Sequence, residues 1–175
     1  MNIYFELLKK YSNSVEDFEI IVNHGLDILG ESLKIIQRKK LYKEVDFDLI
    51  VSGCILHDIG TFKYLKNFNK FQKNYIDHGI IGGKILREEG FKKEALVAER
   101  HIGSGLSMNY IIKNNIPLPK KDFLPISLEE KIICYADKFY SKSGKIDTLE
   151  SIKKEMKGFG KEPFERFLEL EKMFG

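Results

Sequence analysis

The sequence predicts an all-α fold, in the form of a compact single-domain helical bundle. Apolar residues recur at intervals of three and four along most of the chain, which is the spacing of one face of a helix. Residues suited to helix N-caps stand before several of these segments, namely Ser14, Asp46, Asp77 and Ser127. No segment shows a convincing strand pattern, an internal repeat or low complexity.

The length and composition of the chain limit the size of its core and the number of its domains. At 175 residues with 43% hydrophobic content, the chain is long enough to bury one sizeable core. We predict one domain over residues 1–175, with a core of about 15–142 and closing helices at 147–174 that pack on it.

Charge and cysteine content narrow the class further. The chain has 29 Lys and Arg against 26 Asp and Glu, which argues against a dedicated nucleic-acid binder but allows a local phosphate pocket. No apolar run reaches the roughly 18 residues of a membrane span, and the first residues lack the pattern of a signal peptide. We therefore predict a cytoplasmic protein, and leave homodimerisation open. Cys54 and Cys134 are predicted to be buried free thiols.

The first two helices are expected before residue 40. The first is short, at 2–11, and its apolar side consists of Ile3, Leu7 and Leu8. The second is long, and His24 lies on its apolar stripe and therefore points toward the core. A lone histidine in such a place is more often a hydrogen-bonded core residue than a ligand. The stripe comprises Ile20, Ile21, His24, Ile28, Ile35 and Ile36.

The next helix is expected to run from residue 47 or 48 to His57. Gly60 suits a turn that ends it. The segment 61–75 is rich in lysine, asparagine and aromatic residues and has no clean periodicity. A loop of this size directly after His57 and Asp58 is a natural place for substrate contacts.

Two further helices are expected in the middle of the chain. Asp77 is the expected N-cap of the first, and the Gly82-Gly83 pair inside it predicts close packing against a neighbouring helix. The second runs over 92–101, and a glycine-containing loop follows at 103–105.

The last third of the chain contains the clearest helix start. A short helix at 107–114 and an extended, proline-punctuated connection at 117–125 lead to Ser127-Leu128-Glu129-Glu130, which reads as a capping box. Two closing helices are expected at 147–159 and 162–174.

Asp137 is expected inside the apolar helix that follows the capping box. It shares a face with Ile133 and Tyr140, where an uncompensated carboxylate would cost several kcal/mol, so it needs a cation. Lys138 is the simplest partner, but it lies about 100° further round the helix.

The chemistry of the chain is concentrated in Leu56-His57-Asp58-Ile59-Gly60. An imidazole nitrogen and a carboxylate oxygen side by side suit a borderline divalent metal. Further ligands of the same kinds are spread along the chain, and the full order, which includes all four histidines, is His24, His57-Asp58, His78, His101 and Asp137.

This pattern resembles the HD superfamily of metal-dependent phosphohydrolases, in the sub-group with two extra histidines between the HD pair and the last aspartate. His57-Asp58-Ile59-Gly60 is the HDIG signature of that family. His78 followed by Gly82 and Leu86 is similar to its H-x-x-x-G-x-x-x-L helix, and 101–105 is similar to its histidine and glycine loop. The resemblance covers roughly residues 20–140 and implies an HD-type helical bundle.

The resemblance implies two divalent metal ions. Mixed nitrogen and oxygen ligation favours Fe, Mn, Co, Ni or Zn over Ca, with Mg at a partly occupied site. Two such ions roughly 3.5–4 Å apart would supply a bridging hydroxide for in-line attack on a phosphoryl group, without a protein nucleophile. The first ion would be held by His24, His57, Asp58 and Asp137, and the second by Asp58, His78 and His101.

Cations near the metals would recognise the phosphate. Lys63 is the best candidate for a catalytic and substrate-binding cation, although related sequences often have lysine directly after the HDIG or HDI motif, where Thr61 stands here. Surface charge or a simple turn is the alternative for the other candidates, which are Arg100, Gly103, Ser104, Lys138 and Lys142.

The implied reaction is hydrolysis of a phosphomonoester or phosphodiester in a small nucleotide-like metabolite. The pattern also resembles diadenosine tetraphosphate hydrolases and a phosphodiesterase acting on dihydroneopterin cyclic phosphate. It resembles cyclic dinucleotide phosphodiesterases less, because Leu106-Ser107 replaces their Tyr-Pro. Two alternatives stay open: a di-iron oxygenase with the same ligands, and a non-catalytic metal or nucleotide-binding regulatory module.

Overall fold

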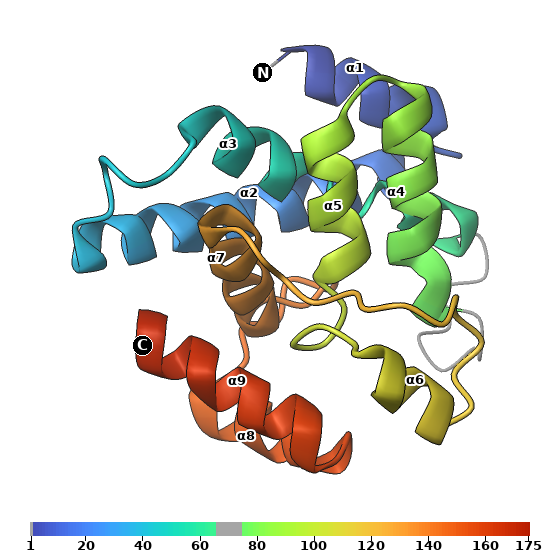
Figure 1. The fold of residues 1–175 in the computed structure, drawn as a ribbon. Coiled ribbons are helices and arrows are strands. Elements are labelled where there is room, and N and C mark those ends of the chain that lie inside the picture. The colour runs from blue at the N-terminus through green and yellow to red at the C-terminus, as the bar shows by residue number, and fades with distance from the viewer. Residues whose placement is uncertain (1, 66–74) are drawn as a thin grey trace.

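The computed structural model describes residues 2–65 and 75–175, and within these ranges the chain is helical and forms no β-strand (Figure 1). The predicted all-α class is confirmed. The α-helices are α1 (Asn2–Tyr11), α2 (Val15–Lys39), α3 (Phe47–Leu56), α4 (His78–Glu88), α5 (Lys92–Arg100), α6 (Met108–Lys113), α7 (Leu128–Ala136), α8 (Leu149–Gly158) and α9 (Lys161–Phe174). The short 3-10 turns are η1 (Ile59–Lys63), η3 (Tyr75–Asp77) and η4 (Asp137–Phe139).

Three of the four predicted N-caps form as expected. The side chains of Ser14, Asp46 and Ser127 each accept a hydrogen bond from the backbone N–H three residues later, at 3.0–3.2 Å. Asp77 stands at the N-cap of α4 but makes no capping hydrogen bond. The predicted N-cap position is therefore confirmed, but the carboxylate of Asp77 accepts a hydrogen bond from the Tyr64 hydroxyl instead of from the helix.

The capping box before α7 is only half formed. The Glu130 carboxylate accepts from the backbone N–H of Ile126 at 2.6 Å, and it also receives the Arg100 guanidinium at 2.9 Å. The helix start is therefore coupled to α5 through a buried ion pair.

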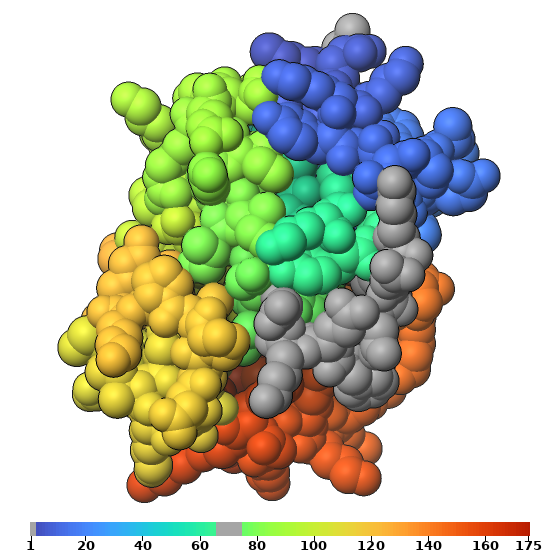
Figure 2. Space-filling view, turned by 90° about the vertical axis from the view of Figure 1, so that its right-hand side faces the viewer, coloured from blue at the N-terminus to red at the C-terminus, as the bar shows by residue number. Residues whose placement is uncertain are grey.

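The helices are arranged around α2, α3 and α7, which share one apolar cluster (Figure 1). The α4 helix packs against α5 and against η1, and α1 covers a second cluster beside them. The α9 helix packs on α7 through Tyr135, Phe167 and Phe174, and α8 packs on α9. Figure 2 shows the C-terminal segment, in orange and red, at the end of the molecule opposite the blue N-terminal helix.

Several predicted boundaries and faces differ in detail. Ile3 is 62% exposed, whereas Leu7 and Leu8 are buried as predicted. The segment 61–75 begins inside η1, and its part at 66–74 lies outside the described residues. The α7 helix ends at Ala136, and the 3-10 turn η4 follows it in place of a continuous helix to residue 140.

The two cysteines are free and buried, as predicted. Burial raises the pKa of both thiols to about 12, which makes them poor nucleophiles at neutral pH. Among the described residues, none of the helices combines the length and the apolar character that a membrane crossing requires.

Gly60 is required by close packing and not by a turn. The preceding helix already ends at Leu56, and Gly60 has no positive φ. A β-carbon at Gly60 would lie 2.0 Å from the backbone oxygen of His78 and 2.5 Å from the backbone nitrogen of Gly82. The absence of a side chain therefore lets η1 approach α4.

Replacing Gly60 with alanine is expected to lower the free energy of unfolding by about 1–3 kcal/mol or more, because backbone must move to admit the methyl group. The matched control is Gly30→Ala in α2, where nothing lies within 4 Å of the new methyl group. That control should stabilise the protein by about 0.5–1 kcal/mol. Urea unfolding of both variants measures the difference, and equal values would show that the approach at Gly60 is relaxed in solution.

Candidate metal centre

The fold brings the six predicted ligands together from helices that are distant in the sequence. His24 comes from the middle of α2, His57 and Asp58 follow α3, and the other three lie at helix ends. All four histidines and Asp58 are buried, and the side chain of Asp137 is 11% exposed. The helices therefore surround a largely buried polar cluster.

Asp58 divides the four histidines into two pairs. Its Oδ2 atom lies 3.2 Å from Nε2 of His24 and 3.5 Å from Nε2 of His57. Its Oδ1 atom lies 3.3 Å from Nε2 of His78 and 3.5 Å from Nε2 of His101. One carboxylate thus presents each oxygen to a different pair of imidazoles.

Asp137 completes the first group. Its Oδ1 atom lies 3.1 Å from Nε2 of His24 and 3.5 Å from Nε2 of His57. His24, His57 and Asp137 also offer ligand atoms within 4.8 Å of one another, as do His57, Asp58 and His101. The first of these groups lies within one of the two implied sites, whereas the second joins His57 of the first implied site to His101 of the second.

Backbone carbonyls hold three of the imidazoles in place. A carbonyl oxygen only accepts, so each Nδ1 facing one carries the proton and each Nε2 presents a lone pair to the cluster. The pairs, at 2.7–2.8 Å, are His57 Nδ1 with Cys54 O, His78 Nδ1 with Tyr75 O, and His101 Nδ1 with Ala98 O.

The donor set fits divalent metal ions. Nε2 of His78 and Nε2 of His101 lie 3.0 Å apart, and with both protons on Nδ1 these two lone pairs face each other. Nε2 of His57 is buried without a hydrogen-bond partner among the described residues. Buried polar atoms are costly unless paired, so the cluster calls for cations at its centre.

Two lysines lie against the carboxylates. Nζ of Lys142 is 2.5 Å from Oδ2 of Asp58, and Nζ of Lys138 is 2.7 Å from Oδ2 of Asp137. The expectation that Lys138 lies too far round a helix is wrong, because α7 ends at Ala136 and the turn that follows is tighter. Burial opposes ionisation, but Lys142 and Lys138 respectively hold the pKa of Asp58 and of Asp137 well below the usual range.

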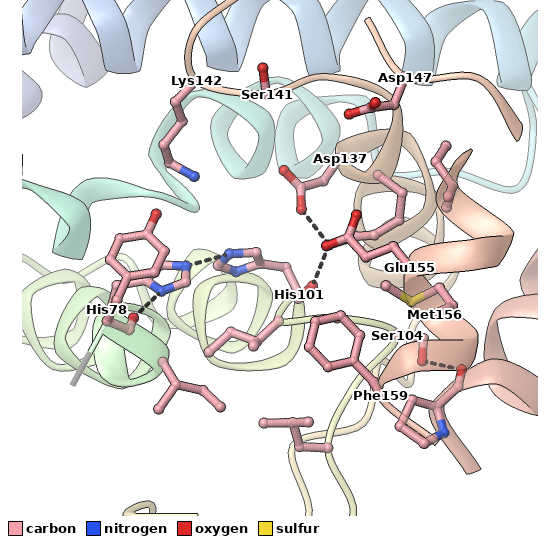
Figure 3. Close-up of a pocket in the computed structure, with 18 of the residues that line it drawn as sticks. His78, His101, Ser104, Asp137, Ser141, Lys142, Asp147, Glu155, Met156 and Phe159 are labelled. Atoms are coloured by element: carbon pink, nitrogen blue, oxygen red, sulfur yellow. Dashed lines mark hydrogen bonds and ion pairs between the residues drawn. The ribbon is translucent and has the colours of Figure 1, made fainter. Parts of the chain in front are cut away.

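A cavity of 890 Å³ opens onto this cluster (Figure 3). His24, His78, His101 and Asp137 line it at one end, together with Lys142. Its other walls come from α6 and from the α8–α9 pair, and Figure 3 shows Met156 and Phe159 on the side away from His78. A small organic molecule can therefore reach the buried histidines from this side.

Comparison with known families agrees with this geometry. The family model described as "HD domain" matches residues 13–141, which include all six residues of the cluster. The chain belongs to the HD-domain family. The match ends before α8, so the six residues of the cluster lie within the matched residues, while part of the cavity wall lies beyond them.

Three of the proteins that the chain resembles come from archaea. An uncharacterized protein of Methanocaldococcus jannaschii is 40% identical over 82% of this chain and 79% of its own length. Two proteins named tRNA (cytidine(56)-2′-O)-methyltransferase, from Thermoplasma volcanium and Picrophilus torridus, are 28% and 36% identical over 78% and 55% of this chain. The chain spans only 35% and 25% of these two proteins. No solved structure matches significantly.

The structure separates the predicted substrate-binding residues into two sets. Gly103, Ser104, Lys138 and Lys142 line the cavity of the HD domain, and Lys63 and Arg100 are absent from its lining. Lys63 is 3.8 Å from Asp77 with a side chain 56% exposed, and Arg100 is paired with Glu130.

The Ser104 hydroxyl makes a hydrogen bond within the fold that the sequence analysis did not predict. This hydroxyl is buried and donates to the backbone oxygen of Pro163 at 2.7 Å. Arg166 donates to the backbone oxygen of Gly105 at 2.8 Å. The loop after His101 therefore docks the start of α9, which local sequence patterns do not reveal.

Tyr75 is a cavity residue that the sequence analysis assigned only to a loop. Its ring stacks on His78 with centroids 4.6 Å apart, and Nζ of Lys142 lies 5.9 Å from its centre. Burial raises the pKa of its phenol, so the group stays protonated near neutral pH. Its position three residues before His78 is the one local signal that could have marked it.

The metal-free HD domain is expected to lose stability in mild acid through His101. Burial, aided by His57 and His78, lowers the pKa of this imidazole from 6.5 to about 4. Below pH 6.5 the unfolded chain binds a proton that the folded chain excludes, so this ring costs about 3 kcal/mol of stability between pH 6.5 and 4. His24 acts in the opposite direction, since hydrogen bonds to Asp137 and Asp58 outweigh its burial and raise its pKa.

Urea unfolding in chelator at pH 7, 5.5 and 4.5 measures this loss. The His101→Gln variant lacks the titrating ring and should lose less stability over the same range. Equal pH slopes for the variant and the natural protein would contradict the assignment.

Proposed function

We propose that this HD domain is a metal-dependent phosphohydrolase that cleaves a phosphomonoester or phosphodiester of a nucleotide-like metabolite. The observation that carries the proposal is the position of Asp58, which faces two histidines with each oxygen. It lies in a cluster whose other members His24, His78, His101 and Asp137 line one end of an open cavity. A carboxylate in this position is suited to bridge two ions.

Two divalent ions are proposed, with Fe, Mn, Co, Ni or Zn favoured by the ligand types. When bound, they supply Lewis acidity toward a phosphoryl oxygen and lower the pKa of water. The first would be held by His24, His57, Asp58 and Asp137, and the second by Asp58, His78 and His101.

The surrounding residues would bind and orient the substrate. Cations that neutralise Asp58 and Asp137 remove the need for Lys142 and Lys138 as counter-charges, so both lysines can turn to the phosphate. The protonated phenol of Tyr75 lines the same cavity and is suited to donate a hydrogen bond to a leaving oxygen. The carbonyls behind the histidines keep each Nε2 directed at the centre.

The similarity to part of two tRNA methyltransferases is compatible with a nucleotide-like substrate. The methyl-transfer activity in their names is not carried over, because this chain spans only 35% and 25% of those proteins.

A screen with two parallel measurements tests the proposal. Metal analysis of the purified chain should find divalent ions, and Mn²⁺ or Fe²⁺ should support hydrolysis of a panel of nucleotides, dinucleoside polyphosphates, cyclic phosphates and bis-p-nitrophenyl phosphate. Oxygen uptake that requires iron, without phosphate release, would instead identify an oxygenase. Bound metal with neither activity would identify a regulatory module.

A further inference from the structure

The far end of the cavity is built differently from the metal end. The metal end carries histidines, Asp137 and two lysines, whereas the far end is mainly apolar and aromatic. Its lining includes Leu106, Tyr110, Ile116, Ile152, Met156 and Phe159. A phosphate alone would leave most of the 890 Å³ unfilled, so the far end is suited to the organic part of a substrate.

Glu155 places a negative charge on this wall. It belongs to α8 and lines the cavity, and its carboxylate makes no hydrogen bond or ion pair with the described part of the chain. Figure 3 shows it on the side of the cavity opposite Lys142 and His78. Its carboxylate can accept hydrogen bonds from a ligand but repels a second phosphate.

Phe159 supplies a flat apolar surface next to this carboxylate. The side chain is 49% exposed although it lines the cavity, and its backbone oxygen accepts a hydrogen bond of 2.5 Å from the Tyr110 hydroxyl. Met156, one turn before it on α8, is buried beneath. Aromatic rings stack favourably on such a surface.

The far wall is tied firmly to the metal end. The loop after His101 bonds to α9 through Ser104 and Arg166, and α6 bonds to the α8–α9 junction through Tyr110. The distance between a stacked ring and the metal cluster is therefore set by the fold. The α8–α9 pair lies beyond the residues that the family model matches.

We propose that Glu155 and Phe159 form a subsite for a flat heteroaromatic ring with N–H donors on one edge, carried by the phosphoester that reaches the metal end. The inference rests on the proposed function for its phosphoester, but ring binding is independent of hydrolysis. Glu155 accepts from the N–H edge, Phe159 stacks on the ring, and the charge of Glu155 disfavours polyphosphate chains that extend to this end.

Calorimetry with guanosine tests the subsite, since this nucleoside has adjacent N–H donors and no phosphoester. The metal-loaded full chain should bind guanosine more tightly than inosine, which lacks one donor group. Glu155→Gln should weaken guanosine binding about ten- to hundredfold, the loss expected for hydrogen bonds to a charged acceptor. Glu150→Gln, on the same helix but outside the cavity, is the matched control and should bind as the natural chain does.

Phe159→Ala should weaken guanosine binding about tenfold through lost stacking. Leu168→Ala on α9 removes a similarly exposed apolar side chain outside the cavity and should have no effect. Circular dichroism confirms folding of each variant.

The subsite is overturned if guanosine does not bind, or if Glu155→Gln and Glu150→Gln bind it equally. Hydrolysis of phosphoesters with either of those results would leave the proposed function intact without this subsite. Guanosine binding that depends on Glu155, in a protein that hydrolyses nothing, would instead support the subsite and remove the hydrolase.

Discussion

Asp58→Asn is expected to lower kcat/KM for any phosphoester turned over by the natural protein by about 10³-fold or more. Asp58 faces both histidine pairs, so the change is expected to weaken both proposed ion sites at once. The purified variant should also contain much less metal. Metal analysis and steady-state kinetics on the active compounds of the screen measure both effects.

The same change should destabilise the metal-free protein by about 3–5 kcal/mol, because a neutral amide leaves the buried Lys142 without its counter-charge. Asp48→Asn is the matched control, since Asp48 is an exposed carboxylate in α3. Its activity, metal content and unfolding midpoint should stay close to those of the natural protein. An Asp58→Asn variant that keeps its metal and its activity would contradict the proposed mechanism.

His78→Ala is expected to remove one of two ions and to lower kcat by about 10²–10³-fold. Of the two Asp58 oxygens, His78 lies near Oδ1, which it shares with His101. Within the described ranges, no hydrogen bond or ion pair joins it to His24, His57 or Asp137. The variant should therefore hold about one divalent ion per chain, bound by the group of His24, His57 and Asp137. Metal analysis after dialysis, paired with activity, measures the outcome.

His24→Ala is the complementary variant. It should empty the first group and leave the pair of His78 and His101. Two ions retained in His78→Ala, or the same loss of both ions in the two variants, would refute the division of the cluster into two sites.

Local patterns in the sequence were enough to predict the helices and the types of residue that suit a metal site. The caps at Ser14, Asp46 and Ser127 formed because a side chain and a backbone N–H three residues apart need no other part of the fold. His57-Asp58 and the order of the other histidines predicted the HD family, which the family model confirms. The metal-binding role of each residue stays a prediction until metal analysis.

The packing of the helices decided which charged side chains form pairs. His24 and Asp137 are 113 positions apart, yet a hydrogen bond joins them. The sequence offered Lys63 and Arg100 as phosphate contacts, but Lys63 lies near Asp77 and Arg100 near Glu130. A lysine or arginine pairs with whichever carboxylate the folded chain brings within reach, and periodicity carries no such information.

The sequence by itself determined an all-α chain, the positions of most helices and the set of residues that suit a metal. Only the tertiary structure decided that Asp58 lies between two histidine pairs, that Ser104 contacts the start of α9, and that Glu155 and Phe159 line the cavity. Helix formation depends on neighbours within a few positions, whereas a cavity wall depends on how distant helices pack against one another.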